Sequence, residues 1–72
     1  MTDSIIDARG MRCPWPVLRL ARAMRDAVHG DEIIIVADDP IAPGEIAAFA
    51  KERGVAITTI STEIGNGWQI TI

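Results

Sequence analysis

The run of apolar residues from Ile33 to Ala37 constrains the fold more than any other feature of the sequence. It is rich in β-branched residues, it is far too short to cross a membrane, and Asp38-Asp39-Pro40 ends it. A continuous apolar strand of this kind is typical of a sheet interior, with little water on either face. The sequence therefore predicts a central strand over residues 32–37, in a chain whose 72 residues allow one domain, residues 1–72.

Two helical patterns stand on either side of this strand. The first begins at Cys13-Pro14-Trp15-Pro16 and is expected to reach about Val28, with Gly30 as its stop. The second has Pro43 in its first turn and Gly54 as its stop. The residues expected to face the core are Val17, Leu20, Ala21, Met24 and Val28 in the first helix, and Ile46, Ala47, Phe49 and Ala50 in the second.

Three further strands are expected over residues 4–8, 55–62 and 68–72. Gly65-Asn66-Gly67 is expected to join the last two as a hairpin turn, because Gly and Asn tolerate positive φ. The order β-α-β-α-β-β predicts an α+β two-layer sandwich, in which two helices cover one face of a four-stranded mixed sheet. A right-handed parallel crossover between the first two strands places both following loops at one edge, so Cys13 and the Asp38-Asp39 pair should be neighbours.

Cys13 is the only cysteine, so the chain can form no internal disulfide, which is typical of a reducing compartment. Pro14 suits the first helical position, and this makes Cys13 the expected N-cap. Pro16 removes one of the amides that a cap side chain normally binds. The Trp15 N–H is then the expected partner of the sulfur, and the two prolines are expected to stiffen the turn and direct Cys13 outward.

Charge is unevenly distributed along the chain. The net charge is −3, which argues against nucleic-acid binding, but the stretch 9–25 carries five arginines and no acid. We expect this basic stretch, with Arg12 and Arg9 nearest, and the positive end of the helix to lower the pKa of the Cys13 thiol. The Asp38-Asp39 pair would raise that pKa if it faces the sulfur unpaired.

Exposed side chains of the first helix are candidates for contact with a partner protein. Trp15 lies almost opposite Val17 around the helix, so it should be partly exposed, and Trp is enriched at binding hot spots. Arg19 and Arg22 lie on the same side and suit an acidic partner surface. The alternatives are local packing of Trp15 and an ordinary solvated face for the arginines.

The remaining polar residues suggest structural roles as readily as chemical ones. The Asp38-Asp39 pair either caps the second helix, orients the cysteine loop or forms a structural turn, and Arg9 is expected to pair with Asp7 or Asp39. One cysteine and one histidine are too few to indicate a metal site. His29 lies at the far end of the first helix from the cysteine, which argues against a Cys–His catalytic pair.

The stretch Asp7-Ala8-Arg9-Gly10-Met11-Arg12-Cys13-Pro14-Trp15-Pro16 resembles the signature of the TusA/SirA-like sulfur-carrier family. That signature is an aspartate-containing strand end and a glycine turn, followed by Cys-Pro-x-Pro. The resemblance continues through Gly30-Asp31-Glu32, Ala37-Asp38-Asp39-Pro40 and the second helix with Ile46 and Phe49, so it covers essentially the whole chain. Cys-Pro-x-Pro alone is a weak signal, but its place after the first strand and the Asp-Asp-Pro after the second make the match specific.

The resemblance implies a sulfurtransferase that holds sulfur as a covalent persulfide on Cys13 and uses no other cofactor. Arg12, Arg9, Pro14, Trp15, Pro16 and the Asp38-Asp39 pair are the residues expected to support that site. The implied partners are a cysteine desulfurase or other sulfur-donor protein, such as a rhodanese-like one, and a downstream sulfur-acceptor protein. The implied destinations are tRNA thiolation, molybdenum cofactor or sulfur oxidation.

Two other classes of function compete with this one. A regulatory or binding module, with a structural or redox-sensing Cys13, is the alternative. A thiol-disulfide oxidoreductase is disfavoured, because no second cysteine can resolve a mixed disulfide within the chain. We expect a cytoplasmic protein, most simply a monomer, with no membrane contact, since the sequence shows no signal-peptide pattern and no long apolar run.

Overall fold

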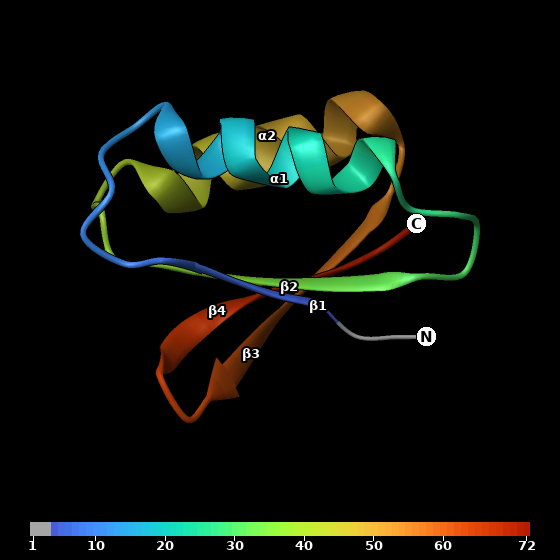
Figure 1. Ribbon diagram of the computed structural model, residues 1–72. Coiled ribbons are helices and arrows are strands. Elements are labelled where there is room, and N and C mark those ends of the chain that lie inside the picture. Colours follow the sequence, from blue (N-terminus) through green and yellow to red (C-terminus); the bar gives the residue numbers. More distant parts are fainter. Residues whose placement is uncertain (1–3) are drawn as a thin grey trace.

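The computed structural model describes residues 4–72, which form a four-stranded sheet and two helices. The elements in chain order are β1 (Ser4–Ala8), α1 (Trp15–Arg25), β2 (Glu32–Ala37), α2 (Ala42–Arg53), β3 (Ala56–Thr62) and β4 (Gly65–Thr71). Both helices cover the same face of the sheet, so the expected two-layer α+β arrangement is confirmed (Figure 1).

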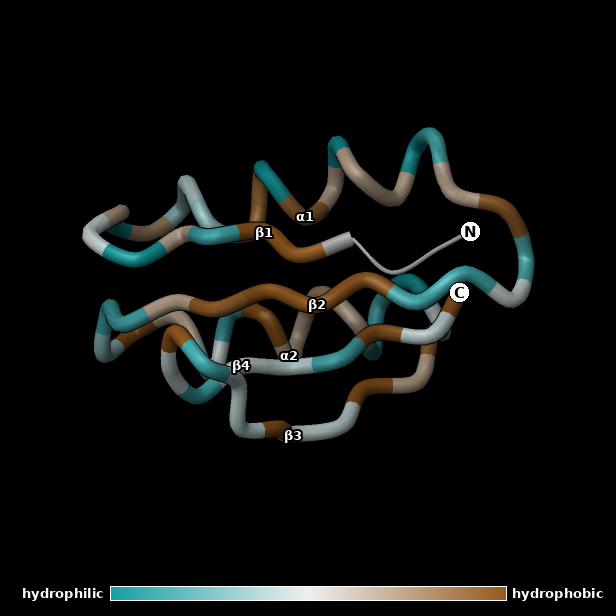
Figure 2. The backbone as a smooth tube through the Cα atoms, turned by 60° about the horizontal axis from the view of Figure 1, so that its bottom comes forward, coloured by the Kyte–Doolittle hydropathy of each residue, from teal (hydrophilic) through white to brown (hydrophobic). Residues whose placement is uncertain are grey.

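β2 is an interior strand of the sheet, whose strand order is β1-β2-β4-β3. β1 pairs with β2 in parallel, whereas β4 pairs antiparallel with both β2 and β3, so the sheet is mixed. Figure 2 shows hydrophobic residues in an unbroken run along β2, and Ile33, Ile35 and Val36 are buried. The expected central strand is confirmed, and pairing on both sides satisfies its backbone donors and acceptors.

The main hydrophobic core lies between the sheet and the two helices. Leu20 of α1, Ile46 of α2, and Ile35 and Ile70 of the sheet have no exposed surface. Burying a large aliphatic side chain contributes roughly 1.5–3 kcal/mol, so these contacts are the main favourable contribution in so small a domain. They also hold both helices against the sheet, which fixes the ends from which the loops leave.

α1 ends earlier than the apolar pattern indicates. The helix stops at Arg25, and Val28 lies beyond it with 67% of its surface exposed, so its expected core position is wrong. The Asp31 carboxylate accepts a hydrogen bond from the Val28 amide at 3.0 Å, which holds this segment in a turn that competes with further helix. Ala27 packs against the core instead, and Gly30, with a φ of 98°, belongs to the turn and not to the helix end.

α2 begins and ends where its sequence signals indicate. Pro43 lies in the first turn, and Gly54 caps the C-terminus in the left-handed conformation, with a φ of 71°. Its buried stripe differs in one position from the expected one, because Ala47 is exposed and Ala42 is buried. Ala42 lies one turn before Ile46 on the row that contacts the core, whereas Ala47 lies beside that row.

The β3–β4 hairpin turn is formed by Glu63 and Ile64, and not by the glycine-rich segment that was expected to form it. The Thr62 hydroxyl donates to the Gly65 carbonyl at 2.6 Å and accepts from the Ile64 amide at 3.2 Å, which closes the turn. Gly65, Asn66 and Gly67 lie inside β4 and pair with β3. A Cβ at Gly67 would collide with the Ile35 carbonyl, so this glycine permits close packing of two strands.

Replacing Gly67 tests this close approach. We expect Gly67→Ala to lower the free energy of unfolding by about 1–3 kcal/mol, because the added Cβ must displace main-chain atoms of β2. Gly44→Ala is the matched control: its Cβ would meet no atom within 4 Å, and alanine is favoured over glycine in a helix by roughly 0.5–1 kcal/mol. Urea denaturation measures the free energy of unfolding of both variants. A Gly67→Ala variant as stable as the wild type would contradict this packing.

Candidate functional site

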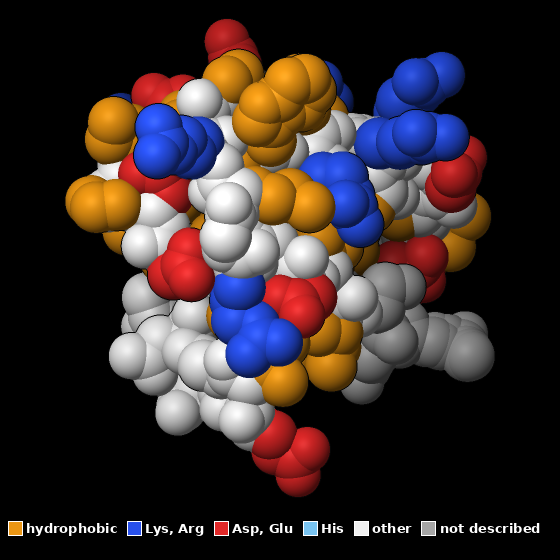
Figure 3. All heavy atoms as spheres, turned by 60° about the vertical axis from the view of Figure 1, so that its left-hand side comes forward, with side chains coloured by type: hydrophobic (Ala, Val, Ile, Leu, Met, Phe, Trp, Pro, Cys, Tyr) orange, Lys and Arg blue, Asp and Glu red, His pale blue; other side chains and the backbone are white. Residues whose placement is uncertain are grey.

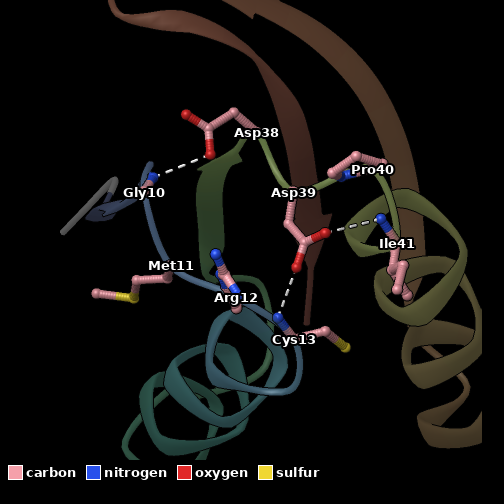
Figure 4. Close-up of a pocket in the computed structure, with 8 residues that line it drawn as sticks. All are labelled: Gly10, Met11, Arg12, Cys13, Asp38, Asp39, Pro40 and Ile41. Carbon is pink, nitrogen blue, oxygen red and sulfur yellow. Dashed lines mark hydrogen bonds between the residues drawn. The ribbon is translucent and has the colours of Figure 1, made fainter.

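The loop after β1 and the loop after β2 lie at the same end of the sheet (Figure 1). Parallel pairing of the two strands requires this, since Ala8 is opposite Ala37 at their carboxyl ends. Together the loops line an open pocket, and Figure 4 shows the side chains around it. The lining residues are Gly10, Met11, Arg12, Cys13, Asp38, Asp39, Pro40 and Ile41. Cys13 and the Asp38-Asp39 pair are therefore neighbours, as the strand order predicted.

The two aspartates of the second loop bind different amides. Asp38 Oδ1 accepts a hydrogen bond from the Gly10 N–H at 2.9 Å. Asp39 Oδ2 accepts from the Cys13 N–H at 2.6 Å, and Asp39 Oδ1 accepts from the Ile41 N–H at 3.0 Å (Figure 4). The Ile41 and Cys13 amides, with the nearby Arg12 charge, hold the pKa of the Asp39 carboxyl below its usual range. Both aspartates thus tie the cysteine loop to the β2–α2 loop.

Cys13 is not the N-cap of α1, which corrects the sequence-based expectation. The Cys13–Pro14 peptide bond is cis, Pro14 is the N-cap, and Pro16 lies in the first turn of the helix. The Trp15 N–H donates to the Arg12 carbonyl at 2.9 Å, so it is not available to the sulfur. A tight turn therefore precedes the helix, and the cysteine lies one residue outside the cap.

The Cys13 thiol is partly exposed, and its pKa is raised rather than lowered. Partial burial is the main cause, followed by a hydrogen bond to the Glu45 carboxylate, the Glu45 charge and the Asp39 charge. The expected fall in pKa is wrong because the thiol is partly buried and because these carboxylates lie close to it. Glu45 was not among the candidates from the sequence. Its place in the first turn of α2, just after the Asp38-Asp39 pair, is the signal that would have revealed it.

Arg9 is directed away from the sulfur. Its guanidinium forms two hydrogen bonds of 2.8 Å with Asp7 and donates to the Ile64 carbonyl at 3.2 Å. The contact with Arg9 lowers the pKa of Asp7 to about 2, and the expected pairing of Arg9 with an aspartate is confirmed. Arg9 thus links the cysteine loop to the β3–β4 turn and leaves Arg12 as the arginine nearest Cys13 in the pocket.

The surface around the loops carries both signs of charge. Figure 3 shows basic and acidic side chains side by side at this end of the molecule, with apolar groups between them. The basic side chains visible on this face do not form one continuous patch. Arg19 and Arg22 are exposed on α1, as expected. Among large apolar side chains, Trp15 and Ile41 expose 59% and 61% of their surfaces.

Neither a metal cluster nor a membrane-spanning helix is present in the described part of the chain. Residues 4–72 contain no group of three or more His, Cys, Asp or Glu side chains placed to hold a metal ion. No helix within that range is long and apolar enough to cross a bilayer. The groups available for chemistry at the pocket are thus the thiol, the carboxylates and the exposed guanidinium of Arg12.

Comparison with known proteins gives one consistent result. Two curated relatives from Neisseria meningitidis, one of serogroup A and one of serogroup B, are each 32% identical over 65 residues, covering 90% of this chain and 88% of theirs. Each bears the name "Putative sulfur carrier protein". The crystal structure of a SirA-like protein from Desulfitobacterium hafniense superposes with a TM-score of 0.80, over 94% of this chain and 95% of that one. At 24% identity, that likeness concerns the fold.

A family model described as "Sulfurtransferase TusA" matches residues 4–72. The match spans both loops of the pocket, both helices and all of the sheet. It agrees with the names of the curated relatives and with the fold of the SirA-like structure. The chain therefore belongs to the TusA sulfurtransferase family.

Proposed function

We propose that this protein is a sulfur carrier that holds sulfur as a persulfide on Cys13 and relays it from a donor protein to an acceptor protein. Membership of a sulfurtransferase family supports sulfur transfer in general. The observation that favours Cys13 as the carrier is its position, because the only sulfhydryl of the chain lies partly exposed at the open pocket between the two loops. Cysteine desulfurases and rhodanese-like proteins are donors with suitable chemistry.

Transfer through Cys13 consists of two displacements at sulfur. The Cys13 thiolate attacks the outer sulfur of a donor persulfide, a new S–S bond forms as the donor's S–S bond breaks, and the donor leaves as a thiolate. An acceptor thiolate then attacks the outer sulfur of the Cys13 persulfide. Cys13 leaves as a thiolate and takes up a proton from water. Neither step consumes an oxidant or a reductant, so one cysteine is sufficient.

The open site suits a relay between two partners. A domain of this size has no enclosed cavity around the thiol, so a donor and an acceptor can each approach the same sulfur in turn. The raised pKa of Cys13 keeps most of the free thiol protonated at neutral pH. We infer that efficient loading takes place in a complex, where partner groups offset the Glu45 and Asp39 charges.

The outer face of α1 is the surface that we assign to partner docking. Trp15 and Leu18 expose 59% and 50% of their surfaces, and they share one face of the helix with Arg19 and Arg22. Exposed aromatic and arginine side chains are typical of protein–protein interfaces. Trp15 is two residues from Cys13, so a partner bound to this face brings its own sulfur close to the thiol.

Replacing the cysteine tests the carrier function directly. After incubation with a cysteine desulfurase and cysteine, the wild type should gain the mass of one sulfur atom, which dithiothreitol should remove. The Cys13→Ser variant should gain no mass, because Cys13 is the only thiol in the chain. Intact-mass measurement reads both. If the wild type gained no sulfur from any of three donors, namely a cysteine desulfurase, a rhodanese-like protein and polysulfide, the alternative of a regulatory or binding module would be favoured.

The raised thiol pKa is tested by Glu45→Gln. Removing this carboxylate should move the midpoint of the pH–rate profile for iodoacetamide to lower pH and speed the reaction at pH 7. The thiolate fraction grows faster than intrinsic nucleophilicity falls, since the Brønsted coefficient is roughly 0.4–0.5. The control Glu52→Gln also removes one negative charge, but two turns further along α2, and should leave the pH–rate profile unchanged. Identical profiles for wild type and Glu45→Gln would show that Glu45 does not act on the thiol.

The docking surface is tested by Trp15→Ala. Loss of an exposed aromatic anchor should raise the KM for a protein sulfur donor about tenfold, since truncation at a hot spot costs about 1–2 kcal/mol or more. Val28→Ala removes an equally exposed apolar side chain beyond the other end of α1 and should leave the KM unchanged. Loading by polysulfide should be equal in both variants. Equal KM values for Trp15→Ala and wild type would place the docking surface elsewhere.

A further inference from the structure

The Asp39 carboxylate connects the cysteine loop to the first turn of α2. One of its oxygens binds the Cys13 amide at 2.6 Å, and the other binds the Ile41 amide at 3.0 Å (Figure 4). The two amides are 28 residues apart in the sequence and have this one side chain in common. Asp38, the preceding residue, binds the Gly10 amide instead and so holds a different point of the same loop.

Fixing the Cys13 amide limits the directions that the sulfur can take. The side chain of cysteine has a single torsion angle that places its sulfur, so an anchored main chain leaves only the staggered rotamers of that one angle. Pro14 on the other side of the residue adds rigidity, because its ring locks its own φ and restricts the residue before it. In Figure 4 the sulfur lies on the side of the loop that faces α2. Glu45, in the first turn of that helix, contributes to the raised pKa of the thiol.

We propose that Asp39 is the positioning residue of this sulfur-carrier site, holding the main chain of Cys13 through its amide so that the thiol stays at the partner-accessible pocket. The inference rests on the proposed function and adds a positioning residue to the proposed site. Asp39 does not touch the reacting sulfur atoms. It acts through the Cys13 main chain, and its negative charge also lies near enough to oppose ionisation of the thiol.

These two effects of Asp39 predict opposite changes in two measurements. Loss of its charge favours the thiolate, so a small alkylating reagent, which has no orientation requirement, should react faster. Loss of the amide contact lets the main chain of Cys13 move and so displaces the sulfur. Displacement of a reacting atom by about 1 Å can cost a hundredfold in rate. Transfer from a docked protein donor should therefore slow.

The charged groups that face the thiol come from three segments. They are Asp39 of the β2–α2 loop, Glu45 of α2 and Arg12 of the cysteine loop, which lies close enough to Asp39 to lower its pKa. The pKa of Asp39 lies below its usual range, so its carboxylate stays ionised at the pH of all thiol measurements. Asp38 is not among the main causes of the raised pKa of Cys13, which makes it a suitable control.

The experiment compares Asp39→Asn with Asp38→Asn. Each variant removes one negative charge and weakens one link between the same two loops. Asn has one oxygen that accepts hydrogen bonds where Asp39 uses two, so one amide loses its acceptor. Asp39→Asn should lower the midpoint of the iodoacetamide pH–rate profile and slow loading from a cysteine desulfurase at least about tenfold. Asp38→Asn should leave the midpoint unchanged and slow loading by less than about threefold.

Asp39→Glu separates charge from position. It keeps the carboxylate but extends it by one carbon, so the pH–rate profile should return to that of the wild type while loading from the desulfurase stays slow. The wild type alone provides a further test by ¹H–¹⁵N NMR. During acid titration the Cys13 and Ile41 amide resonances should shift together, with one common midpoint below the usual aspartate range. This measurement does not depend on a variant that folds.

Three outcomes would overturn the assignment. These are wild-type loading rates in Asp39→Asn, equal losses in Asp39→Asn and Asp38→Asn, and separate acid midpoints for the Cys13 and Ile41 amides. Failure of the proposed function gives a different result, because wild-type Cys13 would then take up no sulfur from polysulfide either. Polysulfide loading of all variants therefore separates the two hypotheses.

Discussion

Parallel pairing of β1 with β2 is the constraint from which the site follows. Because the strands run in the same direction, the chain must cross over through α1, and the loops that follow the two strands meet at one edge of the sheet. One loop carries the only thiol and the other carries two adjacent carboxylates. The carboxylates bind amides of the cysteine loop, so the pairing of β1 with β2 also sets the main-chain position of Cys13.

The electrostatic environment of the thiol is a tertiary property. In the sequence Cys13 lies within a stretch of arginines with no acid. In the fold, Arg9 turns to Asp7 and the β3–β4 turn, whereas Asp39 and Glu45 approach the sulfur from the second loop and α2. Partial burial of the thiol, together with these two carboxylates, raises the pKa of Cys13. In the free protein most of the Cys13 thiol is therefore protonated at neutral pH.

The sequence-based predictions that the structure corrects are wrong for a common physical reason. A glycine-rich segment between two strands has the composition of a turn, yet Gly67 is needed because β2 and β4 approach closely there. Val28 continues the helical period, but a local hydrogen bond from its amide to Asp31 competes with the helix. Pro14 satisfies the preference for the first helical position, but the Arg12–Trp15 turn moves the start of the helix by one residue. In each case a specific contact outweighs a weak local preference.

The sequence by itself determined the order of strands and helices, the central place of β2, the C-cap at Gly54 and the neighbourhood of Cys13 and the two aspartates. These depend on hydrophobic period, on the chirality of crossovers and on the φ requirement of a helix end, all of which are encoded locally or by general rules. Only the tertiary structure decided that Asp39 binds the Cys13 amide, that Glu45 reaches the thiol and that Gly67 lies against Ile35. These contacts join residues more than twenty-five positions apart, and their distances exist only once the helices have packed on the sheet.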